Sequence, residues 1–253
     1  MFYWMNEQQA RDFTAALEVQ QRIYPRIFAS DMLVTFRRNM GFSEDARFMD
    51  ALRAEAATDQ ERSLMWRLHV LCWCAENALQ LEGDFVECGV WRGFSTAVAA
   101  RYLEFGARRK TWHLYDTFAG IPADQLDDGH VSPANFQEAT LYDSVVRRFA
   151  SYPNVAVHRG RVPEVLAGTA PGRIAFLHLD MNSSRAEAGA LDVLYDRLVP
   201  GAYLLLDDYG WYDYRQQKAA ADAFLGPRGA RVLELPTGQG LLVKPGAPAC
   251  SPT

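Results

Sequence analysis

From residue 83 onward, short apolar runs rich in β-forming residues alternate with segments of helical periodicity. The apolar runs cover residues 85–90, 111–116, 155–159, 174–180 and 202–207. The helical candidates cover about 94–105, 136–150, 162–168, 184–198 and 213–225. Because successive parallel strands need a long crossover, which is usually a helix, this alternation predicts an α/β fold. We expect a doubly wound parallel sheet with helices on both faces.

The C-terminal end breaks this alternation. Two β-rich runs, 231–235 and 241–244, are separated only by Pro-Thr-Gly-Gln-Gly. Five residues are too few for a crossover helix and predict a hairpin. We therefore expect a mostly parallel, seven-stranded sheet that ends in an antiparallel hairpin. A dinucleotide-binding dehydrogenase is disfavoured, because no Gly-x-Gly-x-x-Gly follows the first strand.

The first 82 residues form a separate part of the pattern. Segments 7–40 and 45–82 have few glycines and a long apolar–polar periodicity, which predicts helices. This helical extension, with the aromatic residues at positions 2–4, would be a lid, a subunit contact or an ordinary helical core. The expected organisation is an extension over 1–82, a main domain over 83–245 and a flexible Pro-rich tail over 246–253.

The composition is that of an ordinary water-soluble globular protein. Of 253 residues, 49% are hydrophobic and 23% charged, and the formal net charge is −5. No basic excess is available for nucleic acid, so nucleic acid is not expected as a partner. The four cysteines lack zinc-ligand spacing. No signal peptide and no run of about 18 apolar residues is present, so we expect no membrane association and a cytoplasmic location.

The ten residues from Asp84 to Gly93 read Asp-Phe-Val-Glu-Cys-Gly-Val-Trp-Arg-Gly. This run is typical of a buried strand that turns into a helix beside a bound cofactor. Gly89 and Gly93 permit a tight turn and a close approach of the backbone. Glu87 argues against a phosphate-binding loop, which needs exposed amides and little negative charge. A carboxylate there suits a cationic or hydroxyl-rich ligand, and S-adenosylmethionine is both.

Acidic residues follow several of the expected strands. Asp116 ends the second strand, where a carboxylate can accept ribose hydroxyls or merely cap the next segment. Asp180 follows the fourth strand, and Asp207 and Asp208 follow the fifth. The C-terminal ends of parallel strands meet at one edge of a sheet. The three carboxylates therefore predict a Mg²⁺ site, with a hydrogen-bonded acidic cluster without metal as the alternative.

Two histidines differ in their expected roles. His130 belongs to a polar loop after the second strand, above the expected ligand edge. It is the histidine best suited to act as a general base, because imidazole titrates near neutral pH. His178 lies inside an apolar run and is expected to be a packing residue or to support the site from behind.

Five segments carry sequence that is specific to one family. They are residues 83–93, 115–122, 128–130, 191–201 and 206–210. Together they resemble the macrocin O-methyltransferase family, S-adenosylmethionine-dependent enzymes that methylate sugar hydroxyls on macrolides and related glycosides. The resemblance runs from about residue 60 to 225, with Gly-Val-Trp-Arg-Gly and Asp-Asp-Tyr in the expected order. It implies the class I methyltransferase form of the Rossmann-like fold, whose parallel sheet ends in a hairpin.

The resemblance also implies which residues bind S-adenosyl-L-methionine. They are Glu87, Gly89, Val90, Trp91, Arg92, Gly93 and Ser95 around the methionine part, Asp116, Thr117 and Phe118 at the ribose, Gly160 and Arg161 near the adenine, and Asp180. Asp180, Asp207 and Asp208 would hold Mg²⁺ or another divalent cation. The family usually has Asp-Gly-Asp-Leu-Tyr-Glu-Ser where this chain has Asp-Met-Asn-Ser-Ser-Arg-Ala, so Asn182 replaces an acid. The catalytic base would then be Asp180, His130 or a metal-bound hydroxide.

These residues lead to one expected function and two alternatives. We expect divalent-metal-assisted methyl transfer to a hydroxyl of a sugar or of a glycosylated natural product. One alternative is methylation of a catechol-like phenol or an amine with the same cofactor. The other is a cofactor-binding protein of the same fold that has no catalytic activity. The expected partners are a small-molecule acceptor and further copies of the chain, as a dimer or a higher homo-oligomer.

Overall fold

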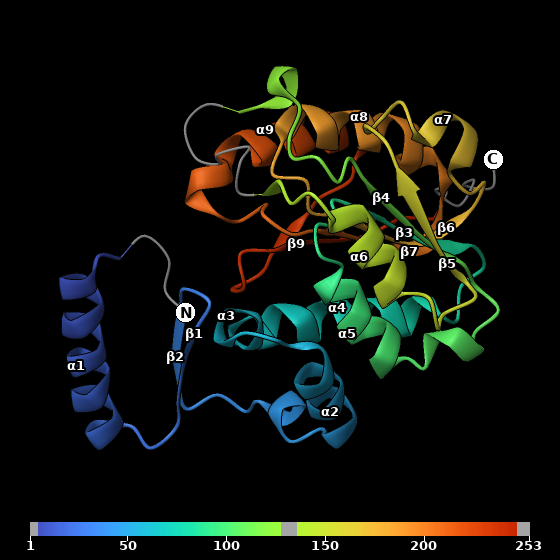
Figure 1. Ribbon diagram of the computed structural model, residues 1–253. Helices are drawn as coiled ribbons and strands as arrows, with labels where there is room; N and C mark the ends of the chain where they lie inside the picture. Colours follow the sequence, from blue (N-terminus) through green and yellow to red (C-terminus); the bar gives the residue numbers. More distant parts are fainter. Residues whose placement is uncertain (1–4, 128–135, 247–253) are drawn as a thin grey trace, which may run out of the picture.

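The expected parallel strands form the centre of a computed structural model that describes residues 5–127 and 136–246 (Figure 1). They are β3 (Asp84–Cys88), β4 (Trp112–Asp116), β5 (Val155–Arg159), β6 (Ile174–Leu179) and β7 (Leu198–Leu206). Two further strands, β8 (Leu233–Glu234) and β9 (Gly240–Val243), form a hairpin that joins β7 in antiparallel orientation. The strand order is β5-β4-β3-β6-β7-β9-β8. The predicted mostly parallel, seven-stranded sheet with a C-terminal hairpin is therefore confirmed.

Helices cover both faces of this sheet (Figure 1). One layer contains α7 (Leu166–Thr169), α8 (Ser184–Leu194) and α9 (Arg215–Leu225). The other contains α2 (Ala46–Glu55), α4 (Met65–Ala78), α5 (Phe94–Tyr102) and α6 (Leu141–Arg148). Each layer packs its own cluster of buried apolar side chains against the sheet. All six residues of β6 are buried for this reason, and His178 is the one polar residue among them.

The N-terminal extension is only partly helical, so the expectation of helix over 7–40 is wrong in its second half. Helix α1 (Glu7–Ile23) is followed by an antiparallel hairpin of β1 (Ile27–Ser30) and β2 (Leu33–Phe36). Pro25 restricts the residue before it to extended conformations, which ends the helix. Asp31 and Met32 then form a two-residue turn with φ of 49° and 58°. Positive φ at both central positions suits the twist of a tight hairpin.

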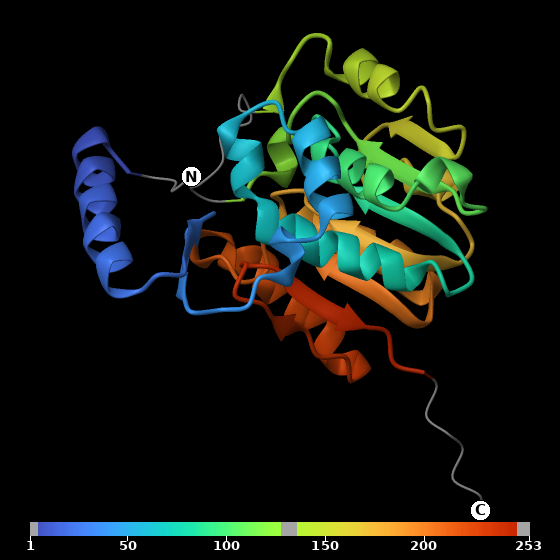
Figure 2. The same cartoon turned by 90° about the horizontal axis from the view of Figure 1, so that it is seen from below.

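The hairpin packs on the first turn of α4. Phe28 meets Trp66 edge-on, with 5.2 Å between ring centroids, and Ser30 Oγ donates to the Ser63 carbonyl at 2.9 Å. Helix α3 (Asp59–Ser63) lies just before α4, and its first turn is closed by a capping box. By contrast, α1 has no buried residue and stands apart from the sheet in both views (Figures 1 and 2). No helix in the described ranges has the length and apolar character needed to cross a membrane.

Candidate active site

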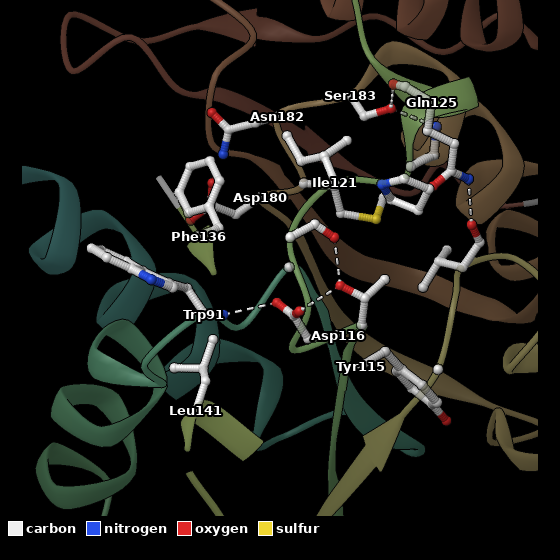
Figure 3. A pocket seen from close by; sticks show the side chains of 18 residues that line it. Trp91, Tyr115, Asp116, Ile121, Gln125, Phe136, Leu141, Asp180, Asn182 and Ser183 are labelled. Atoms are coloured by element: carbon white, nitrogen blue, oxygen red, sulfur yellow. Dashed lines mark hydrogen bonds between the residues drawn. The ribbon is translucent and has the colours of Figure 1, made fainter. Parts of the chain in front are cut away.

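A cavity opens at the C-terminal edge of the parallel strands, where open α/β sheets bind their ligands (Figure 3). It encloses about 700 Å³ of empty space, including its open mouth, which is within the range of small-molecule sites. Six of the residues expected to bind the cofactor line it: Gly89, Trp91, Asp116, Thr117, Gly160 and Asp180. The topology thus brings together residues from four strand ends that are far apart in sequence.

Two glycines shape the turn between β3 and α5. Gly89 has a φ of +88°, and a Cβ on it would lie 1.8 Å from the carbonyl oxygen of Asp180. Gly93 has a φ of +70°, and a Cβ there would meet the ring of Phe149 at 2.8 Å. Both the conformation and the missing side chain are therefore needed. The close contact at Gly89 sets the spacing between the ends of β3 and β6, beside the cavity.

Asp116 links this turn to the cavity. Its Oδ2 accepts from the backbone N–H groups of Val90 at 2.7 Å and Trp91 at 2.9 Å. Its Oδ1 accepts from the N–H of Phe118 at 2.6 Å, a local bond of the capping kind. A carboxylate has about four acceptor positions, so capacity remains for ligand hydroxyls. Asp116 therefore holds the turn in shape while its side chain faces the cavity (Figure 3).

The other expected cofactor contacts lie around the cavity and do not line it. These described residues are Glu87, Val90, Arg92, Gly93, Ser95, Phe118 and Arg161, and their contact with a cofactor stays a prediction. Arg92 Nε donates to Glu138 at 2.8 Å, and an Arg161 NH group donates to Asp124 at 2.9 Å. Glu87 is buried, and its carboxylate accepts a hydrogen bond from the hydroxyl of Thr96.

A second group of side chains adjoins the cavity at the ends of β6 and β7. Ligand atoms of His178, Asp180 and Asp207 all lie within 4.8 Å of one another. We call these three residues the acidic group. Asp208 does not belong to this group, although its carboxylate is buried and interacts electrostatically with Asp207 and His178. The sequence pattern identified the three acids, and it predicted that His178 would either pack in the core or support the site from behind; the structure favours the second of these. A lone polar residue in a strand buried on both faces was the available signal.

For two of the three acids, the charges of Arg67 and His178 do not outweigh burial and the neighbouring acids. Burial, followed by the charges of Asp207 and Asp208, raises the pKa of Asp180 well above its usual range. Burial and the charge of Asp207 raise the pKa of Asp208 to about 7. Asp208 Oδ2 has no hydrogen-bond partner among the described residues. A buried carboxylate oxygen without a partner is costly, so Asp208 favours an additional cation, and the raised pKa of Asp180 points in the same direction.

Asp207 lies beside two cations, Arg67 and His178, and also accepts a hydrogen bond from a neutral amide. Arg67 donates to Asp207 Oδ2 at 2.6 Å, and Gln239 donates to Asp207 Oδ1 at 2.9 Å. Although burial alone would raise the pKa of Asp207, the charges of Arg67 and His178 lower it below its ordinary value. The same guanidinium donates to both carboxylate oxygens of Asp31, at 3.1 and 3.2 Å. Sequence reasoning missed Arg67, whose only signal is a cation within an apolar helix.

His178 connects this group to β3. Its Nδ1 lies 2.9 Å from Glu87 Oε1, and its Nε2 lies 3.6 Å from Asp207 Oδ1. Burial alone would lower the pKa of His178, but the neighbouring carboxylates of Asp207 and Glu87 outweigh it and raise the pKa to about 10. These carboxylates favour the protonated form of His178, with Nδ1 bonded to Glu87 and Nε2 without a hydrogen-bond partner among the described residues. Glu87 acts in this charge network under the cavity.

The chain departs from the family pattern in the segment after Asp180. Asn182 of this segment lines the cavity (Figure 3). Asn182 has a φ of 51°, which turns the chain sharply before α8. Ser183 Oγ then donates to the carbonyl of Gln125, and Ser184 Oγ donates to Asp127 Oδ1, each at 2.6 Å. These bonds tie the loop after β4 to α8. The other base candidate, His130, lies outside the described residues.

The sequence model of one family matches this chain over residues 6–230, and the model is described as macrocin-O-methyltransferase (TylF). The chain belongs to the macrocin-O-methyltransferase family. The expected class of enzyme, an O-methyltransferase, is confirmed by this membership. Within the family match lie the cavity, the acidic group and Arg67.

Two characterised enzymes are similar in sequence. Mycinamicin III 3''-O-methyltransferase of Micromonospora griseorubida is 30% identical over 180 residues, which cover 62% of this chain and 71% of the relative. The 8-demethyl-8-(2,3-dimethoxy-alpha-L-rhamnosyl)-tetracenomycin-C 4'-O-methyltransferase of Streptomyces olivaceus is 29% identical, over 62% of this chain and 67% of the relative. Both names describe O-methyltransferases of natural products.

Two solved structures have the same fold. The O-methyltransferase NovP has a TM-score of 0.61 and 23% identity, over 72% of this chain and 81% of its own. A methyltransferase of Podospora anserina, PaMTH1, solved with bound SAH, has a TM-score of 0.54 and 12% identity, over 97% of this chain and 99% of its own. The expected class I methyltransferase fold is therefore confirmed.

Proposed function

We propose that this protein transfers the methyl group of S-adenosylmethionine to a hydroxyl of a sugar or of a glycosylated natural product, assisted by a divalent cation. One observation carries the proposal: Asp180 both lines the cavity and belongs to the acidic group at the ends of β6 and β7. A cofactor in the cavity and an acceptor at the acids would therefore meet at this residue. The relative that acts on a rhamnosyl compound supports a sugar as the acceptor.

The chemistry of the cavity suits S-adenosylmethionine. Asp116 offers carboxylate lone pairs to the two ribose hydroxyls. The adenine would lie toward Gly160, which lines the cavity at the end of β5. The methionine end would lie toward Gly89 and Trp91. The neighbour solved with SAH, which is the demethylated product of this cofactor, has the same fold.

The donor set at the acids fits a hard divalent cation. Asp180, Asp207 and Asp208 offer carboxylate oxygens, and Mg²⁺ prefers oxygen ligands. The unpartnered Oδ2 of Asp208 is an orphaned buried acceptor that a cation would satisfy. Such a cation would lower the pKa of an acceptor hydroxyl bound beside it. We assign Asp180 the role of base, because its carboxylate lines the cavity at the point where the cofactor and the acceptor would meet.

An acceptor panel tests the function. We expect methyl-labelled S-adenosylmethionine to label nucleotide-activated deoxysugars or rhamnosides at least about tenfold faster than catechols or primary amines. Labelled products separated by chromatography would give the rates, and heat-denatured protein provides the blank. Labelling confined to catechols or amines would contradict the sugar proposal. Binding of the cofactor without labelling of any acceptor would favour the non-catalytic alternative.

We also infer that α1 contacts a second copy of the chain. This helix has no buried residue, and two of its apolar side chains are largely exposed, Val19 at 46% and Ile23 at 62%. A helix of 17 residues gains little stability from its own hydrogen bonds, so a partner surface over its exposed apolar side chains would stabilise it. Light scattering should give a dimer or larger species for the full chain and a smaller one for the Val19→Ser/Ile23→Ser variant. Gln20→Ser is the control, and a monomeric parent protein would refute the inference.

A further inference from the structure

A buried chain of alternating charges connects the N-terminal hairpin to the acidic group. Arg67, in the first turn of α4, has a side chain that is only 14% exposed. Its guanidinium lies between Asp207, at 2.6 Å, and Asp31, at 3.1 Å. Asp31 forms part of the tight turn between β1 and β2, and its side chain is 5% exposed. One cation is therefore shared between a proposed metal ligand and a residue of the hairpin.

The two oxygens of Asp207 are already engaged in the structure. Oδ2 accepts from Arg67, and Oδ1 accepts from the amide of Gln239, which is also buried. Gln239 is held in turn by the hydroxyl of Thr237, 2.9 Å from its Oε1. Asp208 lies next in sequence and has an oxygen without such a partner. Asp207 thus differs from its neighbour in having a cationic partner that belongs to the protein.

We propose that Arg67 competes with the divalent cation for Asp207, and that Asp31 limits this competition by binding the same guanidinium. The inference rests on the proposed metal role. A fixed positive charge 2.6 Å from a ligand oxygen repels a divalent cation and occupies one of its donor atoms. Asp31 neutralises part of that charge and offers Arg67 a bidentate alternative partner. Arg67 and Asp31 are therefore positioning residues that set the affinity of the site for metal.

The hairpin positions Asp31 beside Arg67 through its contacts with α3 and α4. Phe28 packs on Trp66, the neighbour of Arg67, and Ser30 bonds to the carbonyl of Ser63. These contacts fix the turn that carries Asp31 against the first turn of α4. His178 is a second cation near Asp207, at 3.6 Å, but its other ion-pair partner is Glu87, at 2.9 Å, whereas Arg67 pairs with Asp31 in the hairpin turn. The effect of the hairpin on the site therefore passes through Arg67.

Binding of Mn²⁺ alone, measured by electron paramagnetic resonance, tests the proposal without turnover. We expect Arg67→Gln to bind Mn²⁺ about tenfold more tightly or better, because a repelling charge is removed. Asp31→Asn should bind it about tenfold more weakly, because Arg67 then retains its full charge beside Asp207. Asp192→Asn, which makes the same chemical change as Asp31→Asn at an exposed position of α8, should stay within about twofold of the parent protein. Calorimetry with S-adenosylmethionine should give the same affinity in all four proteins.

The opposite signs distinguish competition from a purely structural role. Weaker Mn²⁺ binding in both Arg67→Gln and Asp31→Asn would overturn the proposal, since damage to the site lowers affinity in either case. The Asp31→Asn/Arg67→Gln protein loses both charges together and keeps the test decisive if a single variant fails to fold; we expect it to bind Mn²⁺ at least as tightly as the parent. If none of the proteins binds Mn²⁺ while methyl transfer persists, the metal role and this inference fail, and methyl transfer itself stands.

Discussion

The Asp208→Asn protein is expected to lose methyl transfer by about 10²-fold or more while it binds S-adenosylmethionine as before. Asp208 is buried, does not line the cofactor cavity and has an oxygen without a partner. The amide has nearly the same shape but removes a charged ligand from the proposed cation. Initial rates with a saturating acceptor, together with calorimetry of cofactor binding, would separate the two effects.

Stability should change in the opposite direction to activity. The pKa of Asp208 is raised from 3.8 to about 7, chiefly by burial and then by the charge of Asp207. Because the folded-state pKa lies above the unfolded value, the ionised group costs stability as pH rises from about 4 to 7, and that cost remains at higher pH. Without metal, the asparagine variant should therefore melt at a higher temperature than the parent at pH 8, with a smaller difference at pH 5.

Magnesium chloride provides the internal control for this pair. It should raise the melting temperature of the parent protein, because a ligand that binds only the folded state stabilises it. It should have little effect on Asp208→Asn. Asp192→Asn makes the same chemical change at an exposed position of α8 and should match the parent in every measurement. Parent-like turnover in Asp208→Asn, or equal stabilisation of both proteins by magnesium, would remove Asp208 from the metal site.

The architecture of the main domain could be predicted because its signals are local. A run such as 174–179, apolar apart from His178, is buried on both faces, and only a strand between two helical layers has that environment. The N-terminal hairpin escaped prediction for a local reason too. Its turn consists of Asp31 and Met32, whereas Asn-Gly or Asp-Gly is the usual signal, so the sequence lacks the glycine that normally marks such a turn. Pro25 was the remaining signal that the helix must end.

The site was predictable only as far as topology determines it. The strand order alone brings Asp116, Asp180 and Asp207 to one edge of the sheet, independently of the contacts that their side chains make. The partners of these acids depend on packing between distant segments. Arg67 is 140 positions from Asp207 in sequence, and no periodicity relates them. Glu87 could not be placed from the sequence for the same reason. Its carboxylate pairs with His178 of the neighbouring strand, and this contact depends on packing.

The Gly89→Ala protein is expected to be destabilised by about 3 kcal/mol or more, enough to impair folding. The φ of +88° at this position is strained for alanine, and the new Cβ would lie 1.8 Å from the carbonyl oxygen of Asp180. That carbonyl belongs to the backbone, so relief requires the ends of β3 and β6 to separate. Their hydrogen bond from the Asp180 N–H to the Cys88 carbonyl, now 2.9 Å, would lengthen. Chemical denaturation would measure the change.

Gly168→Ala is the matched control for this substitution. It lies in α7, where a Cβ would have no atom within 4 Å, so alanine should raise stability by about 0.5–1 kcal/mol. If enough Gly89→Ala protein folds for calorimetry, it should bind S-adenosylmethionine more weakly than Gly168→Ala does, because the separated strands carry Asp180 away from the turn that Asp116 holds. Parent-like stability in Gly89→Ala would mean that the close approach of the two strand ends is not what this glycine provides.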